Sequence, residues 1–486
     1  MQLSALTLAS VPASITRPVY DRSRVVSGIV HLGLGAFHRA HQAVYTDAVL
    51  ASGDLAWGIV GAGLVSGRMK AALAPQDGLY TLAEMSADGE RLQIIGSVIE
   101  VLGAEDLPIV LERMAAPSTR IVSLTVTEKG YYIDPASGAL QLANPAIAAD
   151  LAAPQAPKTI LGLIVEALRL RRANGIAPFT VLSCDNLPHN GRRAKAAVVA
   201  FARQLDAAFA DWIEDEVAFP CSMVDRITPA TTDEDLAHVA AELGMEDAGP
   251  VVAEEFTQWV IEDNFTLGRP DWTVGGAVFS NEIARWEDMK LRCLNGSHST
   301  LAYLGQLSGR ETVADAMQSE FIVGVLDALW QEVCEVLEAP SGVDPADYVA
   351  SLRRRFCNPS LKHRTLQIAM DGSQKLPQRL LAPLRARLAR GLPVPALATA
   401  VAGWMHFVAK NAHTPGGMLN DPLAVELLER AQRSKHPAEV VAHLLTCEAV
   451  FGQDLVADVG FRRQLEEKFI ELGRRADLAC AIRPAA

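Results

Sequence analysis

The sequence predicts an α/β protein in which a doubly wound N-terminal domain is followed by a mostly α-helical C-terminal domain. Short β-branched apolar segments alternate with helical patterns over the first part of the chain, and the first of these segments runs directly into a glycine turn. The remainder shows long helical periodicity with few strands. Because 486 residues are enough for more than one hydrophobic core, we expect domains at residues 1–285 and 286–486.

The first predicted strand, residues 25–32, continues into a turn that carries Gly33 and Gly35 and then into a helix. Such a turn lets backbone N–H groups at a helix N-terminus approach a pyrophosphate, which is the physical basis of dinucleotide binding. The third glycine of the usual fingerprint is replaced by His38, which together with Arg39 offers side-chain contacts to phosphate. An ordinary strand-to-helix turn is the alternative.

The second predicted strand, residues 57–64, bears on the choice of cofactor. It ends without the Asp or Glu that would bind an adenosine ribose, and Ser66, Arg68 and Lys70 follow closely. NADP therefore stays open beside NAD. Further strands are predicted at residues 79–85, 92–98, 120–127 and 179–184.

Polar residues follow the later strands of the predicted sheet. Thr127 and Glu128 come at the end of one strand, and Asn186 comes just after another. Open α/β sheets bind ligands beyond the carboxyl ends of their strands, although a turn with solvated charges is the alternative for Thr127 and Glu128. Asp225 lies in a mostly apolar segment, where an ion pair with Arg226 or a turn cap is the structural alternative.

Residues 290–298 are the strongest candidate for catalysis. At about 100° per residue of an α-helix, Lys290, Asn295 and His298 share one face. An amine, an amide and an imidazole are the groups needed to accept a proton from a hydroxyl and to stabilise a developing oxyanion, without a metal. The alternative is a solvated lysine, a capping asparagine and a core histidine.

The second half of the chain predicts helices, with one local concentration of positive charge. Arg364, Lys375 and Arg379 could pair with an anionic group, or they could lie in a solvated turn between two helices. The predicted helices span approximately residues 287–307, 314–338, 345–356, 360–371, 378–391 and 395–410, and continue to about 476.

Composition excludes several classes of protein. The formal net charge is −13, from 44 basic and 57 acidic residues, and there is no basic block, which argues against a nucleic-acid-binding surface. No apolar run approaches about 18 residues, so no membrane partner is expected. No basic residue precedes Arg17, so a secretory signal is not expected and the cytoplasm is the expected location. The seven scattered cysteines contain no Cys-x-x-Cys pair, and no metal site is expected.

Several ordered motifs, spread over nearly the whole chain, resemble the polyol-specific long-chain dehydrogenases, the family of mannitol 2-dehydrogenase and fructuronate reductase. Residues 364–379, which include Asp371-Gly372-Ser373-Gln374-Lys375-Leu376-Pro377, are most similar to the fructuronate reductase (mannonate oxidoreductase) branch. The motifs are Gly33-x-Gly35-x-Phe37-His38-Arg39-Ala40-His41-Gln42, Thr127-Glu128-Lys129-Gly130-Tyr131, Ser183-Cys184-Asp185-Asn186, Met223-Val224-Asp225-Arg226-Ile227, Gln258-Trp259-Val260-Ile261-Glu262-Asp263 and Lys290-x4-Asn295-Gly296-x-His298.

The resemblance implies an NAD(P)-dependent, metal-independent oxidoreductase with an N-terminal Rossmann-type domain. Lys290 is similar to the general base of the family, and Asn186 and Asn295 are similar to its amide pair around the reacting oxygen. His298 would orient the substrate and Asp225 would bind or polarise the site. The cofactor turn of the family is matched by Gly33, Gly35, Phe37, His38 and Arg39.

The expected reaction is the reversible reduction of D-fructuronate to D-mannonate, with Arg364, Lys375 and Arg379 available to the carboxylate. Oxidation of a neutral polyol such as mannitol, arabinitol or sorbitol to a ketose is the alternative. Glu255 stands where the family usually has proline, and a carboxylate there counts against a hexuronate. A zinc alcohol dehydrogenase would need Cys and His ligands at metal spacing, which the sequence lacks. A non-catalytic nucleotide sensor would bind NADH without turnover.

Overall fold

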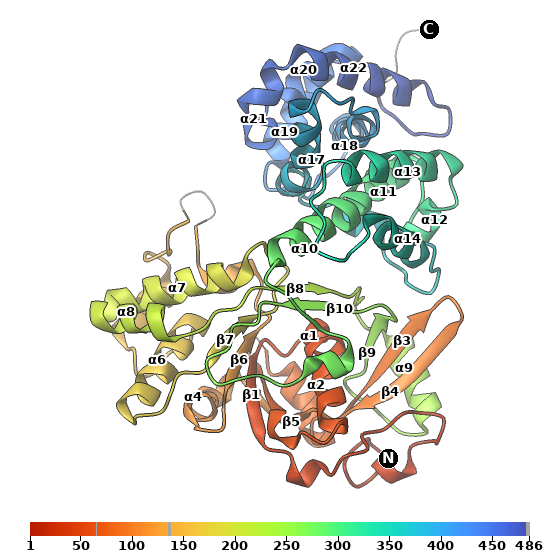
Figure 1. Ribbon diagram of the computed structural model, residues 1–486. Helices are drawn as coiled ribbons and strands as arrows, with labels where there is room; N and C mark the ends of the chain where they lie inside the picture. The colour runs from red at the N-terminus through yellow and green to blue at the C-terminus, as the bar shows by residue number, and fades with distance from the viewer. Residues whose placement is uncertain (65, 135–137, 483–486) are drawn as a thin grey trace. The chain divides into compact units, whose positions relative to one another are not determined.

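The computed structural model describes residues 1–64, 66–134 and 138–482. The chain divides into two compact units, Met1–Ala284 and Arg285–Ala486 (Figure 1). The first unit contains all of the described strands, and the second is built from helices. This arrangement confirms the predicted α/β fold, with a doubly wound domain followed by a mostly helical one.

The first unit is organised around a sheet of five parallel strands in the order β5-β2-β1-β6-β7. The chain leaves β1 toward β2 and β5 on one side and later returns to β6 and β7 on the other, which creates a topological switch point between β1 and β6. Ligands bind at such a point in open α/β sheets. The strands are β1 (Ser27–Leu32), β2 (Gly58–Gly63), β5 (Val98–Gly103), β6 (Ile121–Leu124) and β7 (Thr180–Ser183).

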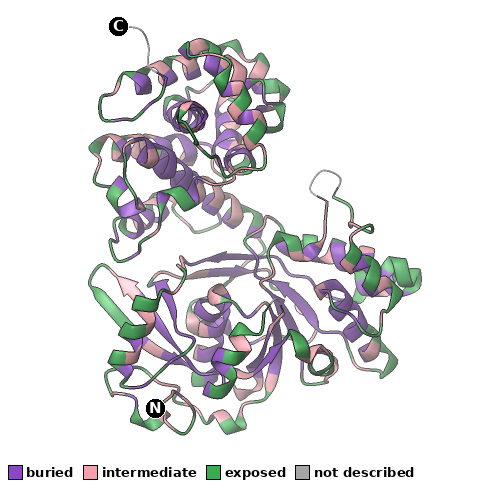
Figure 2. Cartoon of the chain, turned by 180° about the vertical axis from the view of Figure 1, so that it is seen from behind, coloured by how far each residue is buried: buried purple, intermediate pink, exposed green. Residues whose placement is uncertain are grey.

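Helices cover both faces of this sheet because every strand is apolar on both sides. One core packs the sheet against α4, α6 and α7, and the other packs it against α1, α2 and two buried tryptophans, Trp259 and Trp272. Figure 2 shows the strands almost wholly buried between these layers. The helices are α1 (Ala36–Ala40), α2 (Gln42–Ala51), α4 (Leu107–Ala115), α6 (Ile160–Ala173) and α7 (Asn190–Leu205).

Two of the strands predicted for the main sheet belong instead to a separate small sheet. β3 (Tyr80–Ser86) and β4 (Gly89–Ile95) form an antiparallel hairpin, and β9 (Val251–Glu254) pairs with β3. The strand that follows β2 in the main sheet, in sequence order, is β5. The predicted segment 92–98 overlaps β5 only at Val98, its first residue. A further small sheet joins β8 (Ser222–Asp225), β10 (Gln258–Ile261) and β11 (Val278–Phe279).

The second unit is organised around α18 (Pro395–His413), which is buried along nearly its whole length. It packs against α11 (Gly296–Leu307), α13 (Glu320–Cys334), α19 (Ala424–Gln432) and α22 (Val459–Arg474). Within the described residues, no helix has by itself the length and apolar character to cross a membrane. Only α20 (Pro437–Leu445) and α21 (Glu448–Ala457) meet that test as a pair, across a 110° bend.

The long helix predicted at residues 287–307 contains a π-helical segment. α10 (Ile283–Met289) continues into η8 (Lys290–Asn295), which is π-helical, and then into α11. A second π-helical segment, η9 (Pro377–Leu381), lies between α16 (Gly372–Leu376) and α17 (Ala382–Ala389). The two π-helical segments pack against each other. Such segments are rare and occur frequently at functional sites.

Other helices of the second unit differ in length from the prediction. The segment 314–338 is interrupted, because Ser319 caps a new helix: α12 (Val313–Ala316) ends before α13 begins. The predicted helix 360–371 is reduced to the single turn α15 (Thr365–Ile368). The helix α14 (Pro345–Phe356) matches its predicted range and is capped by Asp344.

Candidate active site

The glycine turn after β1 lies at the switch point of the main sheet and is pressed against the end of β6. Gly33 has φ +104°, and a Cβ there would lie 2.1 Å from the carbonyl oxygen of Thr125. The amides of Gly33 and Leu34 donate to the carbonyl of Ala62 at the end of β2, at 2.9 and 3.1 Å. Gly35 has an ordinary extended backbone, and a Cβ there would meet nothing closer than 3.7 Å. Gly35 therefore leaves open space at the turn, as close approach of a phosphate requires.

A buried imidazole contacts this turn from the interior of the first unit. His31, in β1, is fully buried, and its Nε2 lies 2.9 Å from Thr125 Oγ1 and 3.2 Å from the carbonyl oxygen of Gly33. Its Nδ1 lies 2.8 Å from Ser123 Oγ. Burial lowers the pKa of His31 to about 3, so the ring is neutral. His31 was not among the site residues predicted from the sequence, although a histidine inside an apolar strand before a glycine turn is a usable signal.

The other predicted cofactor residues of this turn lie beneath it. His38 is fully buried and stacks on His31 with ring centroids 3.4 Å apart. The guanidinium of Arg39 is buried and donates to the carbonyl of Gly249. Phe37 stacks on His41 at 4.9 Å. In this structure these side chains hold the turn in place from the interior.

The loop after β6 is fixed by Asp185, which follows β7. The carboxylate of Asp185 accepts hydrogen bonds from the amides of Val126 and Thr127, at 2.8 and 2.7 Å, and from the hydroxyl of Tyr131 at 2.7 Å. Burial raises the pKa of this carboxyl group. The predicted residues Thr127, Glu128 and Asn186 are exposed at this end of the sheet. Asp185, the neighbour of Asn186, thus orders the loop that carries Thr127 and Glu128.

Asn190 ties the loop after β7 to β8. Its amide nitrogen donates to the carbonyls of Asp185 and Ser222, at 2.9 and 2.8 Å, and its oxygen accepts from the amide of Ser222 at 2.9 Å. The last residue of β8 is Asp225, which is buried. The neighbouring Arg226 binds the carboxylate of Glu84 at 2.5 Å. Asn190 therefore sets the spacing between the elements that carry Asn186 and Asp225.

In the second unit, the π-helical segment η8 begins at Lys290 and ends at Asn295. Its hydrogen bonds run from residue i to i+5, so residues five apart lie on the same side of the segment. Lys290 and Asn295 are therefore closer in direction than in an α-helix, where about 140° around the axis separates them. Lys290 is buried, as is His298 in the following turn of α11. The π-helical segment brings the amine and the amide closer in direction than the predicted α-helix would.

His298 lies in a buried aromatic and cationic environment. The rings of Phe356 and His363 each have their centroid 5.0 Å from that of His298. The pKa of His298 is held well below its ordinary value, first by burial and then by the charges of His363, Arg355, Arg379 and Lys290. Among the described residues, His298 Nε2 and His363 Nδ1 are buried atoms without a hydrogen-bond partner.

The predicted substrate-binding cations lie in different environments. Arg364 is exposed at the start of α15. The amine of Lys375 donates to the carbonyls of Met370 and Ile368, at 2.6 and 3.3 Å. Arg379 donates to Ser299 Oγ beside His298 at 3.3 Å, and burial lowers its pKa to about 10. The hydrogen bonds of Arg379 to Ser299 and to the carbonyl of Asn295 therefore place this side chain beside the candidate catalytic residues.

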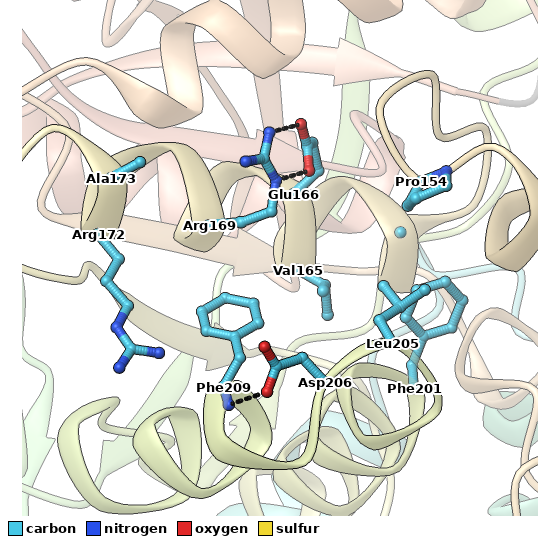
Figure 3. A pocket seen from close by; sticks show the side chains of 11 residues that line it. Pro154, Val165, Glu166, Arg169, Arg172, Ala173, Phe201, Leu205, Asp206 and Phe209 are labelled. Atoms are coloured by element: carbon cyan, nitrogen blue, oxygen red, sulfur yellow. Dashed lines mark hydrogen bonds and ion pairs between the residues drawn. The ribbon is translucent and has the colours of Figure 1, made fainter.

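A separate pocket of about 450 Å³ lies in the first unit between α6, α7 and α8 (Ala207–Glu216) (Figure 3). Its apolar floor includes Val165, Phe201 and Phe209, and the Arg169–Glu166 ion pair, at 2.6 Å, lies on one wall. None of the predicted site residues lines it. Across the described part of the chain, no group of three His, Cys, Asp or Glu side chains is placed to hold a metal ion.

Two family models match the chain, the mannitol dehydrogenase Rossmann domain over residues 27–274 and the mannitol dehydrogenase C-terminal domain over residues 282–472. The chain is 46% identical over 482 residues to a D-mannonate oxidoreductase of Escherichia coli K12, with 98% of this chain and 99% of that protein covered. It is 39% identical over 493 residues to a mannitol 2-dehydrogenase of Pyrenophora tritici-repentis, with 99% and 85% covered. A solved ternary complex of Pseudomonas fluorescens mannitol 2-dehydrogenase with NAD and D-mannitol matches with a TM-score of 0.84 at 38% identity, covering 98% of this chain and 97% of that one.

Proposed function

Because this chain belongs to the mannitol dehydrogenase family of oxidoreductases, we propose that it catalyses reversible, NAD-dependent hydride transfer between D-mannonate and D-fructuronate. The family resemblance predicted from the sequence motifs is confirmed. The choice of a sugar acid over a neutral polyol is supported by the relative that shares 46% identity and carries the name D-mannonate oxidoreductase.

One observation carries the sugar-acid proposal. Arg379 is a partly buried guanidinium beside Asn295 and Ser299, and no carboxylate of the described chain pairs with it. Buried charges in proteins are usually paired, because an unpaired charge is expensive to remove from water. A carboxylate on the substrate would supply the missing partner at the side of the unit that carries Lys290 and His298.

The first unit is suited to bind NAD. Gly33 and Gly35 leave the turn at the switch point open to a pyrophosphate, and a structural neighbour is a complex with NAD. Beyond β2, Lys70 is already paired with Glu105 and Asp106, at 2.9 and 2.5 Å. That ammonium is therefore engaged by acidic side chains, which favours NAD over a cofactor that carries an additional phosphate.

The chemistry of the chain's own residues follows from their types and positions. NAD, when bound, accepts the hydride from the carbon that is oxidised. Lys290, as an uncharged amine, accepts the proton of the substrate hydroxyl, and in the reverse direction it returns that proton. Asn295, on the same side of η8, donates its amide N–H to the oxygen as charge develops there. His298 is neutral and is held by packing, so it orients a hydroxyl by hydrogen bonding.

The second candidate is oxidation of a neutral polyol to a ketose, which the names of the mannitol 2-dehydrogenase relatives favour. A steady-state comparison of D-mannonate and D-mannitol with NAD⁺, followed by NADH absorbance, separates the two. We expect kcat/KM to favour mannonate by at least about tenfold, which corresponds to roughly 1.4 kcal/mol. A preference for mannitol would overturn the sugar-acid proposal and leave the polyol reaction in its place.

A further inference from the structure

Two buried nitrogens next to the candidate catalytic residues have no hydrogen-bond partner among the residues that the structure describes. His298 Nε2 and His363 Nδ1 are both inaccessible to solvent, and neither bonds to any described residue. Their rings meet edge to face with centroids 5.0 Å apart. A buried polar atom without a partner costs about 1–3 kcal/mol, so a pair of them beside a reactive site points to a ligand that satisfies them.

The same place is surrounded by guanidinium groups. Arg355, in the last turn of α14, is buried. The next residue in the chain is Phe356, whose ring packs on that of His298. Burial lowers the pKa of both His298 and His363, and the charge of Arg355 lowers it further. Arg379, from η9, reaches Ser299 on the other side of His298. Two cations from two different elements therefore face one pair of neutral imidazoles.

Within the described part of the chain, no carboxylate forms an ion pair with Arg379. The guanidinium of Arg379 donates to a backbone carbonyl and to a hydroxyl, at 3.4 and 3.3 Å, and both distances are long for a charged donor. Neutral imidazoles add directional N–H donors without further like-charge repulsion. This combination fits a carboxylate, which accepts several hydrogen bonds and brings one negative charge. A neutral hydroxymethyl group would leave the guanidinium unpaired.

We propose that Arg355, His363 and Arg379 form a carboxylate subsite beside His298, and that this subsite selects six-carbon sugar acids over the polyols of the same length. The proposal rests on the proposed function and adds His363 and Arg355 to the specificity determinants. It does not include Arg364, which is exposed, or Lys375, whose amine donates to the carbonyls of Met370 and Ile368.

The test measures binding without turnover. Wild-type protein saturated with NADH is titrated calorimetrically with D-mannonate and with D-mannitol, because a reduced cofactor and a reduced substrate cannot react. The variants are His363→Ala and Arg355→Gln, and Arg354→Gln is the matched control, since Arg354 precedes Arg355 in α14 and is exposed. Thermal unfolding reports whether each variant is folded. His363 is only partly buried, so its variant carries the test if the Arg355 variant does not fold.

We expect wild type to bind mannonate about tenfold or more tightly than mannitol, and each variant to lose most of that preference by weakening mannonate alone. The Arg354 control should keep the wild-type preference. An unchanged preference in His363→Ala overturns the subsite, and so does equal binding of the two ligands by wild type. If wild type binds mannonate selectively but does not oxidise it with NAD⁺, the proposed function fails while the subsite stands.

Discussion

Arg379 donates a hydrogen bond to the backbone carbonyl of Asn295 at 3.4 Å, across 84 residues of sequence. The contact joins the two π-helical segments of the second unit, since Asn295 ends η8 and Arg379 lies in η9. Gly296 allows the close approach, because a Cβ there would lie 3.0 Å from the carbonyl oxygen of Arg379. The position of the Asn295 amide therefore depends on a residue that also borders the proposed carboxylate subsite.

Replacing Arg379 by glutamine should separate activity from stability. The variant loses the long hydrogen bonds to Asn295 and Ser299, but it also removes a partly buried charge that has no carboxylate partner among the described residues. We expect the free energy of unfolding to change by less than about 1 kcal/mol, while kcat/KM for mannonate falls about 100-fold. Urea unfolding and initial rates measure the two quantities.

A surface arginine of the next helix provides the comparison. Arg385, in α17, is paired with Asp454 at 2.5 Å near the surface, and Arg385→Gln should leave kcat/KM unchanged. If Arg379→Gln retained wild-type kcat/KM, Arg379 would have no part in the site. If it unfolded the protein, the guanidinium would be a structural requirement instead.

Replacing Lys290 should remove turnover and leave cofactor binding nearly intact. General acid–base catalysis contributes typically about 10²–10⁴-fold to a rate, so we expect Lys290→Ala to lower kcat by that range. NADH affinity, measured by fluorescence titration, should stay within about twofold, because the cofactor turn is carried by the first unit.

Lys290→Arg distinguishes proton transfer from simple charge. An arginine keeps the positive charge, but it cannot become an uncharged base near neutral pH because its pKa is above about 12. We expect this variant to be as inactive as Lys290→Ala. A Lys290→Arg enzyme with substantial turnover would show that Lys290 acts through its charge, and the general-base assignment would then be wrong.

The two glycines of the cofactor turn should respond differently to alanine. Gly35 has an ordinary backbone and open space around its Cα, so Gly35→Ala should keep its stability within about 0.5 kcal/mol while weakening NADH binding about tenfold or more. Gly33→Ala should lose about 1–3 kcal/mol or more, because its φ is +104° and a Cβ would collide with the carbonyl of Thr125.

An exposed helical glycine serves as the control for these variants. Gly324, within α13, has nothing within 4 Å of its would-be Cβ, so Gly324→Ala should raise stability slightly and leave NADH affinity unchanged. Equal NADH affinity in wild type and Gly35→Ala would show that the open space at the turn does not receive the cofactor.

The patterns that repeat along the chain predicted most of the fold. Apolar β-branched segments located β1, β2, β6 and β7 of the main sheet but not β5, and helical periodicity separated the second unit from the first. The β3–β4 hairpin was harder to assign, because periodicity does not say which sheet an amphipathic strand joins. Strand pairing depends on contacts such as those of β9 with β3, more than 150 residues apart by sequence number.

The candidate site was predictable in residue type and less so in geometry. Lys290, Asn295 and His298 stood out because their side chains can do acid–base chemistry, but nothing in the local sequence marks a π-helical segment. Its formation depends on packing against η9, which lies more than 80 residues later. Likewise, charge alone gave Arg364 and Lys375 the same weight as Arg379. Only burial and hydrogen-bond partners separate the three side chains.

Acidification should destabilise the protein through His31, the neutral imidazole beneath the cofactor turn. Its pKa is about 3 in the folded protein, against about 6.5 for an unfolded chain. Above pH 6.5 the ring is neutral in both states and its contribution is complete. Between pH 6.5 and 3 only the unfolded chain takes up the proton, so stability falls as the pH falls, by up to about 1.4 kcal/mol per pH unit.

A His31→Asn variant isolates this contribution, because an amide does not titrate in this range. The variant can lose stability at pH 7.5 because its contacts with Thr125 and Ser123 change. Between pH 7.5 and pH 5, however, its free energy of unfolding should fall less than that of wild type. The difference should be about 2 kcal/mol in urea unfolding followed by circular dichroism. Parallel declines in the two proteins would mean that His31 takes up its proton without unfolding, and that the imidazole beneath the turn is not held neutral by burial.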